Sequence, residues 1–469
     1  MKQISQRLFK HQSDKIILAG ISLLFAYFLF FHEVREMGDT FQYMNQFVSR
    51  EPAYALLLYA LTGIFGENGY LFVLALIQNV LAVISVYWLY HRLMKLFDFH
   101  ILLRIATAIV LLAPHIVTPL ASQSHMIITN SILTEGISIS IYYLWFGILL
   151  TLLLNRYEKR KALYWGLSFF LAFFLSLIRG QLMICILVML IVASFCAIVR
   201  RKAWYIPIIL LTVAVSFIGK TQLTKIYNKT FSDLYVDTVS SKPMMLANIM
   251  YVAKKEDAEA ISDPKLKETF LTILSGMEKE KLTVEYAPKG LINQSLFHEK
   301  GHEDINFNYI IPGLNEYISN KYQITESEYM KLLVLQDQTA AEMIKEVIKP
   351  AFPEFLKNYF VIASLGFIRS IAVEKSFLPA VAVILYVLFA VMTVLLLKKN
   401  MKSPAAWFAL LVILLICGTV FGTSIMIECI SRYMIYNLPM FYIAGMALVT
   451  EFVKNRNEHK NRNEQEQEK

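Results

Sequence analysis

The chain has 469 residues, of which 57% are hydrophobic and 17% are charged, whereas a soluble domain carries about 25% charged residues. This composition excludes an ordinary soluble protein and predicts a chain whose length lies mostly in a membrane. The formal net charge is +9, but the Lys and Arg residues gather at the ends of apolar runs. We therefore interpret them as signals of membrane topology and expect no nucleic-acid partner.

Ten apolar runs are candidates for transmembrane helices, because a helix needs about 20 apolar residues to cross the hydrocarbon core. The chain starts with a basic stretch and shows no small-residue cleavage site, which indicates an uncleaved first span. The sequence thus predicts an all-α polytopic membrane protein. The predicted spans are residues 15–31, 70–90, 101–121, 131–154, 163–177, 182–199, 204–218, 377–397, 405–426 and 434–452.

Basic residues fall in the N-terminal segment and in the loops after the second, fourth, sixth and eighth spans. Because short basic loops stay in the cytoplasm, both termini are predicted to be cytoplasmic. The basic residues are Lys2, Arg7, Lys10, His91, Arg92, Lys95, Arg104, Arg156, Lys159, Arg160, Lys161, Arg200, Arg201, Lys202, Lys398, Lys399 and Lys402. The outer side then receives residues 33–66, the surroundings of His125, the turn at Arg179, residues 220–376 and residues 428–432.

Four parts are expected along the chain. Residues 1–219 form an N-terminal membrane domain with a catalytic first outer loop, and residues 220–375 form a mainly helical extracytoplasmic insertion with an interfacial segment. Residues 376–453 form the C-terminal membrane helices. The tail, residues 454–469, is low in sequence complexity and is expected to be disordered and cytoplasmic.

Two short apolar runs and two helix starts add detail to these parts. Residues 52–65 are expected to form a juxtamembrane helix in the interface, and residues 355–372 an interfacial or re-entrant segment. In the insertion, Ser262-Asp263-Pro264 predicts a capped helix that runs to about Lys279. Residues 325–328 form a capping box that predicts a helix to about Lys349.

The first outer loop contains acidic and aromatic residues at helical spacing. Glu36, Asp39 and Tyr43 share one face if this stretch is helical. Carboxylates at a wet membrane edge are suited to general-base catalysis. The alternative is a solvated loop that happens to be acidic.

Charged residues also lie at the predicted outer ends of other spans. Glu135 is one turn inside the fourth span, where a carboxylate usually faces a cavity, or else snorkels to the helix end. Arg179 is at the turn after the fifth span, and Arg432 with Tyr433 begins the tenth. Guanidinium groups there suit phosphate binding, although basic and aromatic residues also anchor helices at interfaces.

The motif HEKGHED places His298 and His302 four residues apart, a spacing that puts two metal ligands on one helix face. However, Gly301 favours a loop, and no third ligand follows from the spacing. A solvated polar turn is the preferred interpretation, and no metal is expected.

The predicted topology brings Asp39, Glu135, Arg179 and Arg432 to the same side of the membrane. Two acids and two arginines around one outer cavity fit the transfer of a group carried on a phosphate. An acid would deprotonate the acceptor, and the arginines would stabilise the phosphate leaving group.

Four short motifs in this order resemble the membrane-integral C-type glycosyltransferases, in the group of the protein O-mannosyltransferases and aminoarabinose lipid transferases. They are GDTFQYMNQF with REPAYALLLYALTGIFG, then ILTEGISI, GLSFFLAFFLSLIRGQ and SRYMIYNLPMFYIAGMAL. The resemblance covers residues 15–200 and 376–453. Members of this family transfer a sugar, with inversion, from a polyprenyl-phosphate donor outside the membrane, and most of them need no metal for that step.

The resemblance implies a role for each residue. Asp39 would be the catalytic base, Glu135 would help to orient the acceptor, and Arg179 and Arg432 would bind the donor phosphate, with Tyr433 beside them. The family often has a neighbouring acidic pair in the first loop. Here Asp39 is followed by a threonine and its nearest acid is Glu36, so the base lies between these two, with Asp39 preferred.

The insertion also departs from the family, whose soluble domains often lie at the C-terminus. The acceptor, a cell-envelope glycan, lipid or protein, is expected to be chosen there. Alternative functions are an exported-polysaccharide polymerase and a flippase or transporter for a lipid-linked glycan. A transporter predicts polar residues through the bilayer midplane, whereas here the polarity is concentrated at the outer rim. A pure scaffold leaves Glu135 unexplained.

Overall fold

The structure, a computed structural model, describes residues 2–121, 126–156, 159–324, 328–372 and 378–467. Every named element in these residues is a helix, and ten helices are long and apolar enough to cross a membrane. The prediction of an all-α polytopic membrane protein is therefore confirmed. The helices that contain the candidate spans are α1 (Lys2–Phe31), α3 (Pro52–Leu96), α4 (Ile101–Ala121), α5 (Glu135–Leu153), α6 (Lys161–Ile178), α7 (Ile184–Val199), α8 (Ile206–Ser232), α14 (Leu378–Lys399), α15 (Pro404–Met426) and α17 (Leu438–Gln467).

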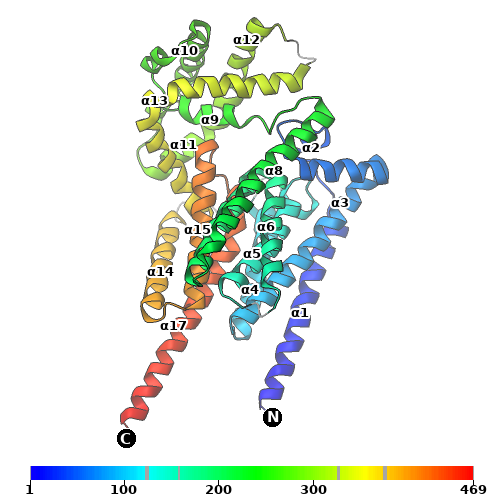
Figure 1. Ribbon diagram of the computed structural model, residues 1–469, viewed down its shortest axis with the longest axis vertical. Coiled ribbons are helices and arrows are strands. Elements are labelled where there is room, and N and C mark those ends of the chain that lie inside the picture. Colours follow the sequence, from blue (N-terminus) through cyan, green and yellow to red (C-terminus); the bar gives the residue numbers. More distant parts are fainter. Residues whose placement is uncertain (1, 122–125, 157–158, 325–327, 373–377, 468–469) are drawn as a thin grey trace.

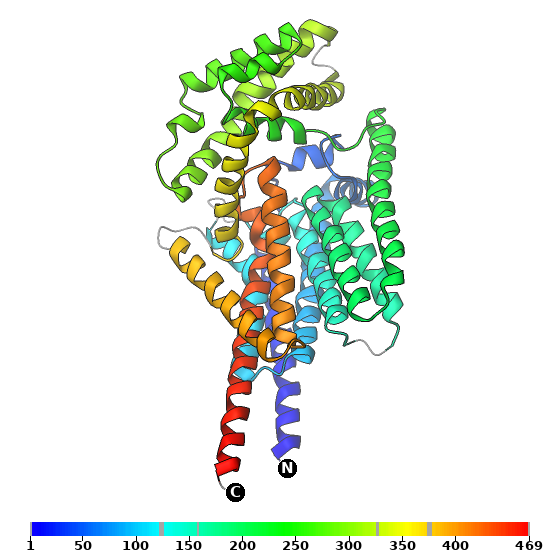
Figure 2. The same cartoon turned by 60° about the vertical axis from the view of Figure 1, so that its left-hand side comes forward.

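The remaining helices belong to the first loop, to the insertion and to the last turn, and all of them except the 41-residue α13 are short. Figures 1 and 2 show the insertion at one end of the bundle and both termini at the opposite end. The predicted outer surroundings of His125 lie outside the described residues. The helices are α2 (Thr40–Met44), α9 (Ser241–Met250), α10 (Pro264–Lys279), α11 (Leu291–Asp304), α12 (Ile311–Tyr322), α13 (Tyr329–Arg369) and α16 (Ser431–Met434).

Helix α5 lies inside the bundle because its sequence is largely apolar on every face. Trp145 is fully buried, and two glycines allow α3 to approach closely. A Cβ atom at Gly136 would lie 2.1 Å from Gln78 Oε1, and one at Gly147 would lie 2.5 Å from Trp88 Cζ3. The position of α5, and of the residues at its N-terminal end, is therefore fixed by close packing.

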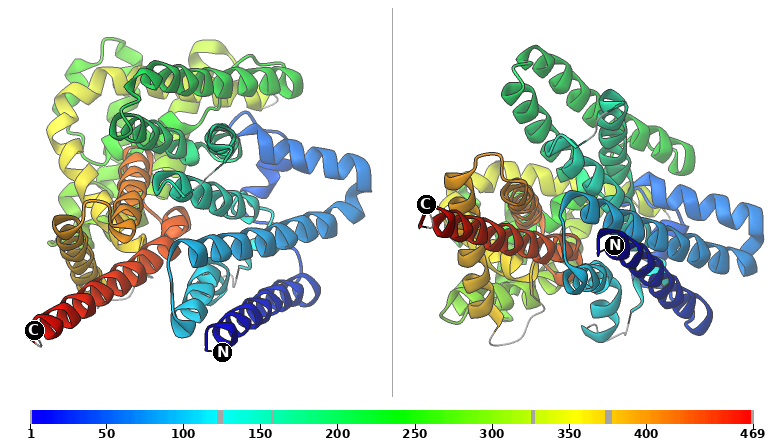
Figure 3. Two further views of the ribbon diagram at one scale, coloured as in Figure 1. Left: turned by 60° about the horizontal axis from the view of Figure 1, so that its bottom comes forward. Right: turned by 90° about the horizontal axis from the view of Figure 1, so that it is seen from below.

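Helix α3 bends sharply at Gly66, where φ is 68° and ψ is 174°. This conformation is open to glycine and strained for other residues. The candidate span begins at Gly69, so residues 52–65 form a separate arm before it. Figures 1 and 3 show this arm running across the end of the bundle instead of along it, as expected for a juxtamembrane helix.

The insertion has a hydrophobic core of its own, built from α9 to α13 and including Leu246, Phe270, Leu314 and Met343. Asp263 caps α10 as predicted: its Oδ1 atom accepts hydrogen bonds from the backbone amides of residues 265 and 266 at 2.8 and 3.2 Å. The helix also ends at Lys279, as expected. This core gives the insertion a fixed shape at the end of the bundle.

Residues 355–369 are the last part of the long helix α13, and their interfacial or re-entrant position stays a prediction. The capping-box residues 325–327 lie outside the described residues. The tail is helical as far as Gln467, where disorder was expected. Glu, Lys, Arg and Gln are good helix formers, and extending an existing helix avoids the unfavourable nucleation step.

Candidate functional site

Four residues that were predicted to act together form one continuous network of charges. Arg432 Nη2 lies 3.3 Å from Asp39 Oδ2, and Arg432 Nε lies 3.3 Å from Glu135 Oε1. Arg179 Nη1 lies 2.5 Å from the same Glu135 oxygen. We call these four residues, together with Arg50, the charged cluster. Four segments that are far apart in sequence supply it, so it is a product of the fold.

The first loop is pinned to the segment that precedes α5. Arg35 N donates to Asn130 O at 2.8 Å, and Ile132 N donates to Arg35 O at 3.0 Å. Thr40 Oγ1 also donates to Ile132 O at 3.0 Å. These backbone bonds hold Asp39, the residue before α2, beside the start of α5.

The expectation of one helix face for Glu36, Asp39 and Tyr43 is wrong for Glu36. Helix α2 starts only at Thr40, because the backbone bonds of Arg35 hold the preceding residues in a non-helical conformation. Glu36 is exposed, and among the described residues no ion pair joins it to the charged cluster. Of the two candidate bases, Asp39 alone lies in the network.

Arg50 is a member of the cluster that the sequence analysis missed. Its Nη2 atom lies 2.7 Å from Asp39 Oδ1, and its Nε atom donates to Gln42 Oε1 at 2.7 Å. The guanidinium also lies over the ring of Tyr43, 5.1 Å from the ring centroid, a favourable cation–π arrangement. In the sequence, the feature that could have identified Arg50 is its position directly before Glu51-Pro52, where α3 begins.

Glu135 is the buried centre of the cluster. It is the first residue of α5, where the positive end of the helix dipole favours a carboxylate. Thr134 Oγ1 donates to Glu135 Oε2 at 3.1 Å. A buried carboxylate is tolerated only when it is paired, and here Arg179 and Arg432 both pair with it.

Tyr433 contacts both of the arginines that share Glu135. Its ring centroid lies 4.7 Å from Arg179 Cζ and 5.5 Å from Arg432 Cζ. Gln181 Nε2 donates to Tyr433 O at 2.8 Å, which ties the turn after α6 to the residues before α17. The aromatic ring and the carboxylate together stabilise two guanidinium groups that would otherwise repel each other.

The side chains of the cluster differ in exposure, from buried to partly accessible. The side chains of Glu135 and Arg179 are 2% and 12% exposed, whereas those of Asp39, Arg50 and Arg432 are 28%, 24% and 29% exposed. Three guanidinium groups face two carboxylates, which leaves one positive charge in excess within the cluster. An anion that reaches the accessible side would therefore be attracted.

A second buried ion pair lies next to the cluster, at Glu51, the residue that follows Arg50. Glu51 Oε1 lies 3.0 Å from Lys220 Nζ of α8. Burial raises the pKa of Glu51, although the nearby Lys220 opposes this shift. A Cβ atom at Gly180 would lie only 2.8 Å from Glu51 Oε1. The glycine next to Arg179 thus permits a close approach between the start of α3, the turn after α6 and α8.

The HEKGHED motif is not the solvated turn that was expected. Residues 298–304 belong to α11, and both His298 and His302 are buried. Gly301 is tolerated in the helix because it is buried next to Leu282, 3.6 Å from where a Cβ atom would lie. In the described part of the chain, no group of three or more His, Cys, Asp or Glu residues is arranged to hold a metal.

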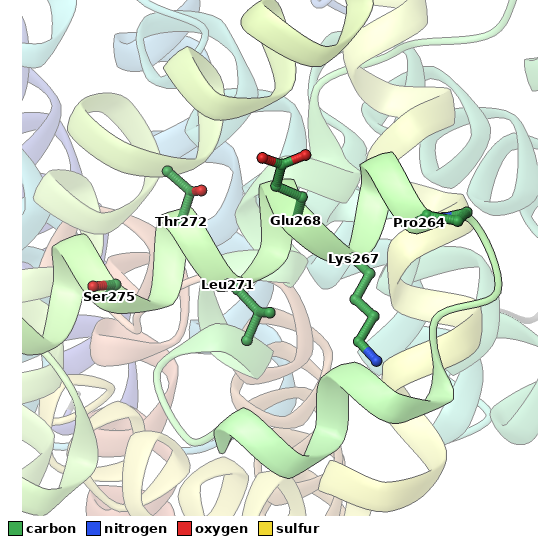
Figure 4. Close-up of a pocket in the computed structure, with 6 residues that line it drawn as sticks. All are labelled: Pro264, Lys267, Glu268, Leu271, Thr272 and Ser275. Carbon is green, nitrogen blue, oxygen red and sulfur yellow. The ribbon is translucent and has the colours of Figure 1, made fainter.

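A hollow of about 520 Å³ lies on the insertion, away from the charged cluster. Figure 4 shows that its labelled side chains all come from one helix, α10. Lys267, its one basic group, is paired with Glu259 at 2.8 Å. The hollow is thus a shallow surface feature without converging groups. It is lined by Pro264, Lys267, Glu268, Leu271, Thr272 and Ser275.

Comparison of the chain with protein-family models, with curated proteins and with solved structures finds no match. A functional assignment therefore depends on the geometry and the charge of the cluster.

Proposed function

We propose that this multi-pass membrane protein is a glycosyltransferase that transfers a sugar from a polyprenyl-phosphate donor to an extracytoplasmic acceptor. The acceptor is a hydroxyl of a cell-envelope glycan, lipid or protein. The observation that carries the proposal is the network from Asp39 through Arg432 and Glu135 to Arg179. Together with Arg50, it combines an accessible carboxylate with guanidinium groups in excess, which are the groups that this reaction needs.

In the proposed reaction, Asp39 accepts the proton of the acceptor hydroxyl. The hydroxyl oxygen bonds to the anomeric carbon while the bond from that carbon to the donor phosphate breaks. The electron pair of the broken bond stays on the phosphate oxygen, and polyprenyl phosphate leaves with one more negative charge. Arg179 and Arg432 stabilise that charge as it develops. A single displacement inverts the anomeric configuration.

Arg432 is the arginine best suited to exchange partners. Its contacts with Asp39 and Glu135 are both 3.3 Å long, whereas the Arg50–Asp39 contact is 2.7 Å and the Arg179–Glu135 contact is 2.5 Å. A donor phosphate that draws Arg432 away leaves Asp39 with one guanidinium partner instead of two. Loss of that partner makes the Asp39 carboxylate a better proton acceptor.

Glu135 has a positioning role in this proposal. Its side chain is 2% exposed and its Oε1 atom lies against two guanidinium groups. The resemblance implied that Glu135 orients the acceptor, but a carboxylate in these surroundings acts through the arginines that it holds. Arg50 holds Asp39 in the same way from the accessible side.

The test is sugar transfer by the Asp39→Asn variant, measured by mass analysis of cell-envelope glycans in cells that carry the variant in place of the wild-type protein. Loss of transfer at unchanged protein level is expected, because the amide cannot accept the proton. Glu36→Gln, in the same loop, should retain transfer. Undiminished transfer by Asp39→Asn would exclude Asp39 as the base.

Glycan analysis, together with a transfer assay of the purified protein, separates the alternatives. A polymerase would change the length of a glycan built from repeats, whereas a glycosyltransferase changes the presence of one sugar. A flippase would leave purified protein without transfer activity on a supplied donor and acceptor.

A further inference from the structure

A buried ion pair joins the insertion to the segment that carries Arg432. Residues 427–430 connect α15 to α16. Within them, Glu428 Oε2 lies 2.7 Å from His302 Nδ1 of α11, and both side chains are almost fully buried. Glu428 is four residues before Arg432, so α11 contacts one end of the short segment that contains the arginine.

A second contact holds the same segment from α13. Arg369 Nη1 donates to Cys429 O at 3.1 Å, and Arg369 Nη2 lies 2.8 Å from Glu299 Oε2 of α11. A Cβ atom at Gly366 would lie 2.8 Å from Cys429 Sγ, so the helix and the segment are in close contact. Two helices of the insertion therefore fix the residues that precede Arg432.

The two ring nitrogens of His302 each lie close to an oxygen atom of another segment. Nδ1 faces the Glu428 carboxylate, and Nε2 lies 3.2 Å from the carbonyl oxygen of Met244. His302 therefore lies between the segment before Arg432 and helix α9.

A second buried histidine of α11 lies close to His302. The ring of His298 lies 5.4 Å away, between centroids. Burial, and to a lesser extent the charge of His302, lowers the pKa of His298 well below its ordinary value. Arg369 and Glu299 pair with each other. Glu428 is the carboxylate that lies directly against His302.

We propose that His302 is a positioning residue for Arg432: its contact with Glu428 holds the Glu428–Arg432 segment against the insertion, as a latch. The positional part of this inference stands on the contacts alone, and its consequence for donor binding rests on the proposed function. It also gives the insertion a task, which is to set the geometry of the charged cluster.

The positional part is tested with a nitroxide label on Ser431→Cys, an exposed site next to Arg432, in the full-length protein. Electron paramagnetic resonance spectra are compared for the otherwise wild-type chain and for His302→Gln under the same conditions. The label should be immobile in the wild type and mobile in His302→Gln. Glu428→Gln, which removes the other partner, should give the same mobile spectrum if His302→Gln fails to fold.

The matched control is Glu278→Gln, which removes the pair between Glu278 and Lys255 elsewhere in the insertion and should leave the label immobile. Identical spectra for wild type and His302→Gln would overturn the latch. A label that is mobilised by Glu278→Gln as strongly as by His302→Gln would overturn it as well.

The functional part is tested by binding of farnesyl phosphate, a short prenyl phosphate. His302→Gln should weaken the affinity roughly tenfold, since a small displacement of a binding group has effects of this size or larger. Wild-type protein that does not bind farnesyl phosphate would count against the proposed function while the label still decides the latch. Unchanged affinity in His302→Gln, with normal binding by the wild type, would overturn the role of His302 in positioning Arg432.

Discussion

The Glu135 carboxylate lies 2.5 Å from the Arg179 guanidinium, and both side chains are largely buried. Removing one partner of a buried ion pair leaves an uncompensated charge and costs about 3–5 kcal/mol. The pair therefore links the stability of the bundle to the geometry of the site, because the same carboxylate also holds Arg432.

Glu135→Gln should lower the stability of the protein by about 3 kcal/mol, as it leaves Arg179 buried without its negative partner. The measurement is thermal unfolding of the purified protein in detergent. Asp233→Asn, which breaks an exposed i,i+4 pair with Lys229 on α8, serves as the control and should cause no measurable change. Equal effects of the two substitutions would contradict the assignment of Glu135 as the centre of the cluster.

Arg432→Ala should weaken binding of a prenyl phosphate at least tenfold, because a guanidinium in direct contact with a phosphate contributes about 1.5–3 kcal/mol. Arg432→Lys should recover part of the loss, since it restores the charge but not the bidentate geometry. The measurement is the dissociation constant of farnesyl phosphate. Equal affinities of wild type and Arg432→Ala would remove Arg432 from the phosphate site.

Gly180→Ala should disturb the site without changing any charged residue. Its Cβ atom would lie 2.8 Å from Glu51 Oε1, so Glu51 must move away from Lys220, and we expect a loss of stability of about 1–3 kcal/mol together with reduced transfer. Gly166→Ala is the matched control, because nothing lies within 4 Å of a Cβ atom at that helical position. This control should be neutral or slightly stabilising.

The stability of the protein should fall as the pH is lowered, because His298 is buried in its neutral form. Burial lowers the pKa of His298 in the folded protein, so the unfolded chain binds the proton more readily. The contribution of His298 is fully present above the ordinary imidazole pKa of about 6.5 and is lost below it, by up to about 1.4 kcal/mol per pH unit.

The measurement is the Tm of the full-length protein between pH 5 and 8, in wild type and in His298→Leu. The substitution should reduce the loss of stability at acid pH, because leucine has no proton to gain. The same acid dependence in both proteins would show that other groups cause it.

The sequence was enough to predict the ten spans and the proximity of Asp39, Glu135, Arg179 and Arg432. Both depend on patterns of apolar and basic residues along the chain. Apolar length determines a span, and the alternation of basic loops places each charged residue near the same end of the bundle. The distances between these residues could not be predicted, because they depend on side-chain packing between helices.

Arg50 and the histidines of α11 were missed or misread for a related reason. Arg50 lies in an irregular loop, and its contact with Asp39 depends on the hydrogen bonds that the Arg35 backbone and the Thr40 hydroxyl make to a distant segment. Gly301 suggested a turn, but packing against the insertion core keeps that residue helical. Local sequence rules fail where tertiary contacts determine the backbone.

The bend at Gly66 bears on the depth that the charged cluster would have in a bilayer. The arm before it exposes Leu56, Tyr59, Ile64 and Phe65, the kind of surface that binds at the level of lipid headgroups. Arg50 and Glu51 lie at the beginning of this arm, so an arm bound at that level would bring the cluster to the height of the lipid phosphates. A prenyl-linked substrate would then present its phosphate to the arginines while its tail stays in the hydrocarbon.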